Sequence, residues 1–326
     1  PSRPLAAALL ALVALAGPAP GQPPEAPAEA EPPAQPTSAE VLEAAAPSDW
    51  RALDPERTLY VELPGGRVVI ELAPEFAPRH VENVVKLARE GYFDGLAVLR
   101  SQENYVVQWG DPKAGEEGAR AMRTGKAGLA AEFDRPIARD GGGDLPFTPL
   151  PDGDVYAPEV GFTLGFPAAR DARSGEGSGR TWLAHCYAMV GAGRGDTADS
   201  GSGAELYVVI GHAPRHLDRT VTLLGRVVRG MEALSTLPRG TGALGFYEDP
   251  SEHVPVLSVK VAADVPPAER TPLELLRTDT ATFEAWIASR RHRRESWFLD
   301  PVGRIELCNV PLPVREPPAP APDAQP

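Results

Sequence analysis

The stretch that decides the fold lies at residues 96–112 and reads LAVLRSQENYVVQWGDP. Large apolar and β-branched residues at 96–100 and 105–109 favour two short strands, and the polar residues between them favour a turn. In such a hairpin Arg100 and Gln108 face each other across the strands. They are the functional-looking polar side chains of this apolar run, so they mark a candidate site.

This pattern resembles the cyclophilin family of peptidyl-prolyl cis-trans isomerases, in a divergent, exported bacterial form. The family signature places an arginine, an aromatic residue, an apolar residue and a glutamine before Gly-Asp, and the matching residues here are Arg100, Tyr105, Val106, Gln108, Gly110 and Asp111. The resemblance continues in the family's order through residues 58–72, 77–90, 93–95, 188–193, 205–210, 216–218 and 224–231. This shared order implies the family's fold.

The segments upstream of the hairpin agree with a mainly β fold. Residues 58–63 and 67–72 alternate in polarity around Pro-Gly-Gly, which predicts a second hairpin. Pro78 then opens a predicted helix with valines on one face. Strands, a helix and more strands favour a closed antiparallel cyclophilin-like β-barrel, capped by helices and spanning residues 50–264.

Composition and charge exclude some partners. A chain of 326 residues with 42% apolar content can bury a core. Its formal net charge of −13 disfavours nucleic acid, because phosphate binding depends on clustered Lys and Arg.

The two ends of the chain look unlike the middle. Arg3, the apolar run at 5–16 and a small-residue pattern before Gly17 predict a signal peptide at residues 1–16 and a periplasmic or secreted protein; the alternative is an Ala/Leu tail in a cytoplasmic protein. The run is shorter than the ~20 residues of a membrane span, so we expect no span. Residues 17–48 and 311–326 are proline-rich, which predicts a linker and a solvated tail.

Two regions of the sequence are longer than a compact barrel requires. Residues 113–180 are rich in Gly, Pro and Ser, which predicts a long loop excursion that either folds over the barrel or is partly mobile. Glu132-Phe133 is similar to a Glu-Phe of the family, so the excursion is an enlarged family loop. In a C-terminal extension at 271–310, capping residues at Thr271 predict one helix, residues 280–294 a second, and residues 304–308 a strand.

Two features of the extension remain open from sequence. The basic cluster at 290–294 suits the negative end of a helix dipole, and it could also bind anionic lipid or nucleic acid. Cys186 and Cys308 are the only cysteines, and an oxidising compartment would permit them to pair. Buried free cysteines also behave as small hydrophobes, so both states are possible. A disulfide would fasten the extension to the barrel.

The family's reaction breaks no covalent bond. The barrier to rotation about a peptide bond, ~18 to 20 kcal/mol, arises from delocalisation of the nitrogen lone pair into the carbonyl. Catalysis needs an apolar pocket for the proline ring and a fixed cationic donor near the prolyl nitrogen. A guanidinium suits this role because it stays charged and presents several N–H groups in a rigid fork. We expect no cofactor and no metal.

The resemblance implies a role for each site residue. Arg100 would be the donor, and Gln108 would hold the guanidinium or bind the substrate backbone. Tyr105 would complete the catalytic set beside the proline ring. The implied substrate-binding residues line the pocket, border the extended substrate or place an anion near the arginine: Val106, Val190, Gly191, Glu205, Tyr207 and Leu217.

The chain departs from typical cyclophilins around the pocket. Tyrosines replace two phenylalanines, valine replaces methionine, glycine replaces asparagine and glutamate replaces glutamine, at Tyr105, Tyr207, Val106, Gly191 and Glu205. His216 and Val221 stand where the family has a tryptophan and a histidine. These changes predict a smaller and more polar pocket that holds proline less tightly.

The predicted function is prolyl isomerisation that assists the folding of exported proteins, with their proline-containing segments as partners. The alternative is a non-catalytic proline-peptide-binding or chaperone module on the same fold. A third interpretation makes the extension and the excursion an interaction surface. The sequence indicates neither the client proteins nor the oligomeric state.

Overall fold

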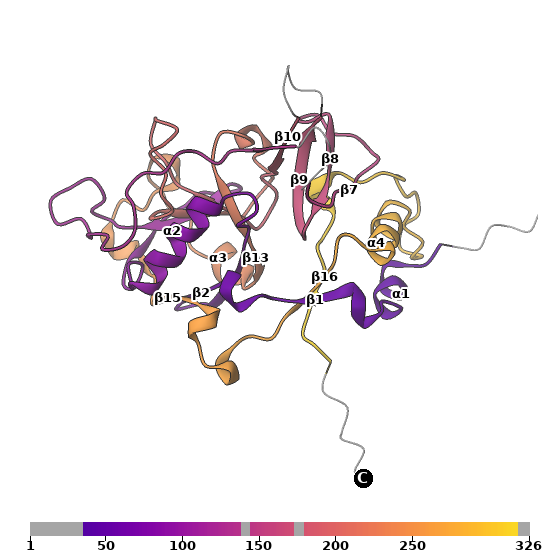
Figure 1. Cartoon of the computed structure of the whole chain (residues 1–326), viewed down its shortest axis with the longest axis horizontal. Coiled ribbons are helices and arrows are strands. Elements are labelled where there is room, and N and C mark those ends of the chain that lie inside the picture. The colour runs from indigo at the N-terminus through magenta and orange to yellow at the C-terminus, as the bar shows by residue number, and fades with distance from the viewer. Residues whose placement is uncertain (1–34, 138–143, 173–178, 319–326) are drawn as a thin grey trace, which may run out of the picture. The chain divides into compact units, whose positions relative to one another are not determined.

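The computed structural model describes residues 35–137, 144–172 and 179–318, and the predicted signal peptide lies outside them. The α-helices within these ranges are α1 (Ser38–Glu43), α2 (Pro78–Arg89), α3 (Met231–Ser235) and α4 (Ala281–Arg291). The strands are β1 (Trp50–Ala52), β2 (Thr58–Leu63), β3 (Gly66–Leu72), β4 (Ala97–Ser101), β5 (Val106–Gly110), β6 (Arg135–Pro136), β7 (Thr148–Pro149), β8 (Glu159–Thr163), β9 (Phe166–Asp171), β10 (Arg180–Leu183), β11 (Met189–Ala192), β12 (Leu206–Val209), β13 (Leu223–Arg229), β14 (Val254–Pro255), β15 (Ser258–Val261), β16 (Glu274–Leu276) and β17 (Val314–Arg315). They form three antiparallel sheets (Figure 1).

The largest sheet has nine strands in the order β14-β4-β5-β12-β11-β13-β3-β2-β15. Both predicted hairpins are present in it, as β2–β3 and β4–β5. The expected closure is only partial, because the sheet curls into a half-barrel whose edge strands do not pair. The chain crosses between the edges instead: Val256 N–H donates to Leu96 O beside β4, and Leu257 N–H donates to Glu62 O on β2.

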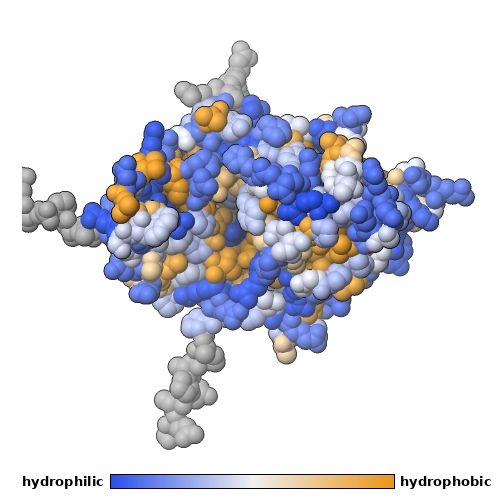
Figure 2. Space-filling view, turned by 180° about the vertical axis from the view of Figure 1, so that it is seen from behind, coloured by the Kyte–Doolittle hydropathy of each residue, from blue (hydrophilic) through white to orange (hydrophobic). Residues whose placement is uncertain are grey.

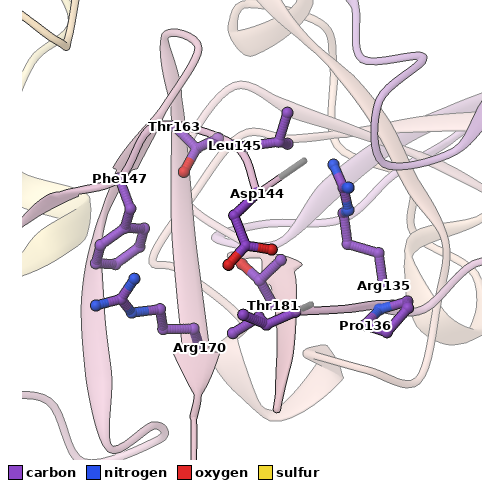
Figure 3. A pocket seen from close by; sticks show the side chains of 9 residues that line it. Arg135, Pro136, Asp144, Leu145, Phe147, Thr163, Arg170 and Thr181 are labelled. Atoms are coloured by element: carbon purple, nitrogen blue, oxygen red, sulfur yellow. The ribbon is translucent and has the colours of Figure 1, made fainter. Parts of the chain in front are cut away.

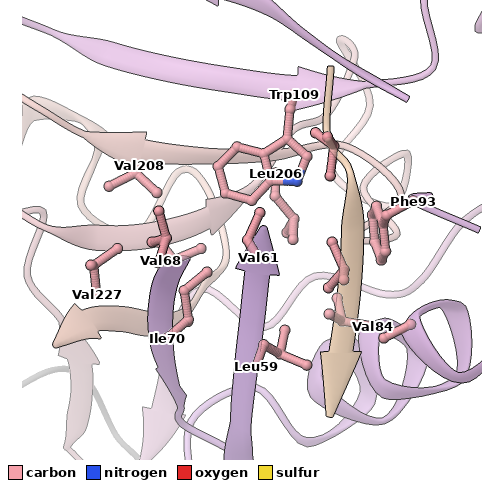
Figure 4. Packing of buried hydrophobic residues seen from close by; sticks show 14 of the residues in the cluster. Leu59, Val61, Val68, Ile70, Val84, Phe93, Trp109, Leu206, Val208 and Val227 are labelled. Carbon is pink, nitrogen blue, oxygen red and sulfur yellow. The ribbon is translucent and has the colours of Figure 1, made fainter. Parts of the chain in front are cut away.

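Helix α2 covers one face of this sheet. Val84 and Leu87 of this helix are fully buried in one core cluster with Leu59, Ile70 and Trp109 of the strands. Figure 4 shows Val84 of the helix within this cluster. The predicted helix is stable here because its apolar face is buried against the sheet.

The start of the excursion caps α2. Ala77 at the N-cap position offers no side-chain acceptor, and the Glu132 carboxylate accepts instead from the backbone N–H groups of Arg79 (3.1 Å) and His80 (3.0 Å). The His80 ring lies 2.7 Å from the same carboxylate. Although burial alone would raise it, these donors lower the pKa of Glu132 to about 2. The residue that resembles the family's Glu therefore has a structural role at a helix end.

The rest of the excursion forms a second sheet, where we expected a loop. Its order is β6-β10-β9-β8-β7, and Leu164 and Gly165 turn β8 into β9 with φ values of 52° and 87°. Such a turn matches the twist of a two-residue hairpin. Residues 138–143 and 173–178 of the excursion lie outside the described ranges. A small cavity of about 30 Å³ beside Phe147, Arg170 and Thr181 indents this sheet (Figure 3).

The C-terminal extension differs from its prediction in two places. The helix expected at Thr271 is strand β16, because Leu275 and Leu276 are buried and the segment pairs with β1. No strand forms at 304–308; a 3-10 turn at Leu307–Asn309 ends that segment. The second predicted helix is confirmed as α4, with Thr280 accepting from Phe283 N–H at 3.2 Å.

The predicted linker and tail are also partly ordered. Helix α1 lies inside the expected linker and packs on α4, with a 3.0 Å hydrogen bond between the Ser38 and Ser289 hydroxyls. Strand β17 lies inside the expected tail and pairs with β16. Residues 17–34 and 319–326 of these two segments lie outside the described ranges.

A second hydrophobic core joins the extension to the nine-stranded sheet. It combines Val106 and Tyr207 of that sheet with Phe162 and Trp182 of the five-stranded sheet and with Phe283 of α4. Cys186 and Cys308 form a disulfide within it, with Cα atoms 4.9 Å apart. The extension is thus fastened covalently to the strand region that carries the candidate site.

The surface is mainly hydrophilic on the face shown in Figure 2, where hydrophobic residues gather around a hollow. Among the described residues, no helix is long and apolar enough to cross a membrane.

Candidate active site

Strand register places the two predicted polar residues opposite each other. Arg100 on β4 pairs with Gln108 on β5, after an irregularity between Val98 and Arg100. The Arg100 Nη1 atom donates to Gln108 Oε1 at 3.0 Å. The hairpin therefore brings the guanidinium and the amide together directly, as the spacing predicted.

The Arg100 guanidinium is held on three sides. Its Nε donates to the Leu244 carbonyl at 2.6 Å, its Nη1 to Gln108, and its Nη2 to the Gln102 amide oxygen. One N–H on each terminal nitrogen has no partner within the described residues. Tyr105 and Phe246 place their rings 5.4 and 5.3 Å from the guanidinium carbon. The guanidinium is therefore fixed in position and keeps two N–H groups that can donate to a substrate.

Two effects shift the pKa of Arg100 in opposite directions. Burial lowers the pKa of Arg100, and the carboxylate of Glu205 acts to raise it. A guanidinium remains protonated after such a shift. Glu205 also accepts from the Gln108 amide nitrogen, so both ends of that amide are engaged. Gln108 consequently orients the guanidinium, and its second amide N–H has no partner within the described residues.

A cavity of about 290 Å³ opens beside this cluster. Its lining combines two guanidinium groups with aromatic and aliphatic side chains: Arg100, Tyr105, Val106, Gln108, Gly193, Arg194, Tyr207, Leu217, Thr220 and Val221. The Tyr105 ring is kept in place by the His216 ring, which stacks on it at 6.4 Å. We call Arg100, Gln108 and Tyr105 the rim of this cavity, and Tyr207 with the groups behind it the floor.

The floor rests on a buried histidine. The Tyr207 hydroxyl lies 2.9 Å from His185 Nε2, and His185 Nδ1 lies 3.0 Å from Asp218 Oδ1. His185 is fully buried, and burial lowers its pKa, so the ring is neutral. The neutral ring donates from Nδ1 to Asp218 and accepts from Tyr207, whose pKa burial raises.

Gly191 makes room for this tyrosine. A Cβ at this position would lie 2.3 Å from the Cζ and hydroxyl oxygen of Tyr207. Two departures from the family are therefore linked, since the ring and its hydroxyl occupy the space behind Gly191. Because the hydroxyl is engaged by His185, it does not make the cavity more polar, contrary to our expectation.

Asp218 connects the floor to the excursion. It accepts from Arg215 Nε at 2.7 Å, and Arg215 Nη1 reaches Asp154 of the excursion at 2.9 Å. Although burial alone would raise it, donation from His185 and the charge of Arg215 hold the pKa of Asp218 below its ordinary value. All three ion-pair partners are buried, with side-chain exposures of 2 to 5%.

The structure separates the predicted site residues into two groups. Six of them line the one cavity: Arg100, Tyr105, Val106, Gln108, Tyr207 and Leu217. Val190 is wholly buried in the core under α2, so its side chain does not border a substrate. Gly191 lies behind Tyr207 and Glu205 lies behind Gln108.

Sequence reasoning missed part of the lining. Arg194 Nε donates to Thr220 O at 2.9 Å, which holds a second guanidinium at the cavity. Arg194 follows the predicted strand within a glycine-rich segment, and only the long-range bond to Thr220 shows which way it turns. Within the described ranges, no group of three or more His, Cys, Asp and Glu side chains could hold a metal ion.

Comparisons with known proteins agree with this geometry. Residues 58–261 match the family model described as cyclophilin type peptidyl-prolyl cis-trans isomerase/CLD. A probable peptidyl-prolyl cis-trans isomerase of Brucella suis is 27% identical over 214 residues, which cover 65% of this chain and 86% of that protein. The crystal structure of cyclophilin AquaCyp293 from Hirschia baltica superposes with a TM-score of 0.63 and 26% identity, covering 82% of this chain and 92% of that one. The chain belongs to the cyclophilin-type peptidyl-prolyl cis-trans isomerase family.

Proposed function

We propose that Arg100 drives isomerisation by stabilising the twisted prolyl amide of a substrate bound in the cavity. As the bond rotates, the nitrogen lone pair becomes localised and can accept a hydrogen bond. The observation that carries the proposal is the guanidinium held by Leu244, Gln108 and Gln102, with one N–H left on each terminal nitrogen. A donor fixed before the reaction needs no reorganisation during it.

The cavity supplies the second requirement. Tyr105, Val106, Tyr207 and Leu217 give it apolar walls next to Arg100. A pyrrolidine ring would bury its methylene groups there and place the prolyl nitrogen near the rim. In this arrangement Gln108 positions the arginine, and Glu205 sets how much of its charge the substrate experiences.

The test is a proline-peptide isomerisation assay on the wild-type protein and on Arg100→Ala and Arg100→Lys. We expect the alanine variant to lose at least about a hundredfold in kcat/KM, the usual cost of removing one preorganised donor. Lysine should restore little, because it lacks the planar fork. Arg89→Ala at the end of α2, which breaks exposed ion pairs with Glu56 and Asp264, is the matched control.

An equal rate in wild type and Arg100→Ala would remove Arg100 from the mechanism. A wild-type protein that binds the peptide without speeding its exchange would favour the alternative, a proline-peptide-binding or chaperone module. Glu205 is the feature that favours this alternative, since its charge partly offsets that of Arg100.

We further propose that the substrates are proline-containing segments of exported proteins. The Cys186–Cys308 disulfide supports an oxidising compartment, because cytosolic thiols are kept reduced. Thiol labelling of the protein in fractionated cells tests this: both cysteines should resist labelling until a reductant is added. Free thiols in a cytosolic fraction would contradict the proposed clients.

A further inference from the structure

The loop that follows α4, residues 292–304, exposes large apolar side chains. Trp297, Leu299 and Val302 are 81, 94 and 83% exposed. Side chains lining a groove cannot reach such values, so these three must protrude from the surface. Large exposed apolar side chains gathered at one place commonly mark an interaction site.

Both ends of this loop are fixed on one carboxylate. Asp152 of the excursion accepts from Arg291 Nε at 2.6 Å and Nη2 at 2.7 Å, and also from Ile305 N–H at 3.0 Å. Inside the loop, the Arg293 guanidinium lies 4.9 Å from the Phe298 ring, which meets Trp297 edge to face at 5.1 Å. The tip is therefore presented from an anchored base.

The loop is basic although the chain is acidic. Residues 292–304 contain three arginines and two carboxylates, a net charge of +1 with histidine neutral, and the last two residues of α4 add Arg290 and Arg291, which brings residues 290–304 to +3 in a chain of −13. Arg291 and Arg293 pair with Asp152 and Glu295. Arg294 and Arg304 are exposed and have no ion pair in the described part of the chain, although the charge of Arg304 also acts on the Asp152 carboxylate.

We propose that this loop attaches the protein to an anionic lipid surface. Trp297, Leu299 and Val302 enter the interface, while Arg294 and Arg304 contact lipid phosphates. Tryptophan and aliphatic side chains flanked by arginine suit this boundary, which has an apolar and a charged layer. A bilayer also accepts protruding side chains without a matching pocket.

Other partners fit the tip less well. Nucleic acid would use stacking aromatics along a basic groove, and exposed leucine and valine offer neither. A folded protein would need a complementary recess for three side chains on a narrow tip. The basic cluster that the sequence left open is thus divided: Arg291 anchors the loop, and Arg294 is available to lipid.

The experiment uses the full chain with vesicles of phosphatidylcholine, with or without phosphatidylglycerol. We expect co-sedimentation with the anionic vesicles, weakened by added salt. Trp297 provides a second readout, because the other four tryptophans are 8% exposed or less. Brominated phosphatidylcholine should quench its fluorescence in anionic vesicles, and Trp297→Phe should abolish that quenching.

Substitutions separate the apolar and the charged contributions. Trp297→Ala with Leu299→Ala should lower partitioning into anionic vesicles by at least about tenfold, because two large apolar groups leave the interface. Arg294→Gln with Arg304→Gln should reduce the salt dependence. Leu257→Ala, at a leucine 54% exposed beside β15, is the control and should change neither. Thermal unfolding of each variant confirms that it is folded.

Three results would overturn the proposal. One is no sedimentation with anionic vesicles. Another is sedimentation that the Trp297 and Leu299 substitutions leave unchanged. The third is a concentration-dependent dimer in light scattering that these substitutions dissolve, which would assign the tip to self-association.

Discussion

The rim and the floor of the cavity differ in burial and in how they are supported. Arg100 and Gln108 at the rim are half-buried. Arg100 donates to Leu244, Gln108 and Gln102, and Gln108 donates to Glu205. Tyr207 at the floor rests on His185, Asp218 and Arg215, which are buried almost completely. Because buried polar groups depend on their partners, changes at the floor should cost stability, whereas changes at the rim should cost rate.

The disulfide beside the floor should show the largest effect on stability. Cys186 directly follows His185, and its bond to Cys308 spans 122 residues. The chain-entropy model predicts a loss of up to about 5 kcal/mol for Cys186→Ser with Cys308→Ser. Equilibrium urea unfolding measures it, and reductant should lower the wild-type midpoint by a similar amount. An unchanged midpoint would show that the extension holds without the bond.

Arg215 should be the next most costly position. Arg215→Met leaves the Asp218 and Asp154 carboxylates buried without their cation. Breaking one side of a buried ion pair typically costs about 3 to 5 kcal/mol. The exposed pair Arg277–Asp279 offers a control, since Arg277→Met should cost little. Similar losses of stability at both arginines would show that burial of the ion pair does not decide its contribution.

Gly191→Ala tests the floor by crowding it. The added methyl would meet the Tyr207 ring at 2.3 Å, so the ring must move towards the cavity. We expect a loss of about 1 to 3 kcal/mol, as for other overpacked cores, and a raised KM with kcat nearly kept. Gly65→Ala, between β2 and β3 and outside the cavity lining, is the control, because its methyl meets nothing closer than Ala233 at 3.7 Å. If kcat falls and KM does not rise, Tyr207 acts in catalysis together with the rim residues.

Lowering the pH should reduce the stability that the floor contributes and should leave the contribution of the rim unchanged. The pKa values of His185 and Asp218 are both lowered in the folded chain, so the unfolded chain binds protons first as pH falls. The contribution of His185 is present above its ordinary pKa of 6.5 and declines below it, by at most about 1.4 kcal/mol per pH unit, whereas that of Asp218 declines only below its ordinary pKa of 3.8. His185→Gln should flatten this decline in urea unfolding between neutral and mildly acidic pH. A decline as steep as in wild type would place the acid-sensitive group elsewhere.

The sequence predicts the rim better than the floor. Arg100 and Gln108 follow from strand alternation, which sets their facing positions within one hairpin. The link of Tyr207 to His185 and Gly191 could not be predicted, because strand pairing and ring orientation decide it. Local signals also misled at Thr271, where capping residues precede a strand that pairs with β1, more than two hundred residues earlier.

The second sheet was missed for a related reason. Its hairpin at Leu164-Gly165 has a recognisable two-residue turn between apolar strands, which a search for such turns would have found. Its short outer strands, β6 and β7, carry no such signal and form only against their neighbours. Composition rich in Gly and Pro concealed them.

Exchange of a proline peptide at saturating concentration, followed by NMR, tests the division between rim and floor most directly. We predict that Arg100→Ala binds the peptide about as tightly as wild type and exchanges it at least about a hundredfold more slowly. Gly191→Ala should bind more weakly and exchange the bound peptide at nearly the wild-type rate. An Arg100→Ala variant that binds poorly yet exchanges bound peptide at the wild-type rate would place Arg100 in binding and not in catalysis.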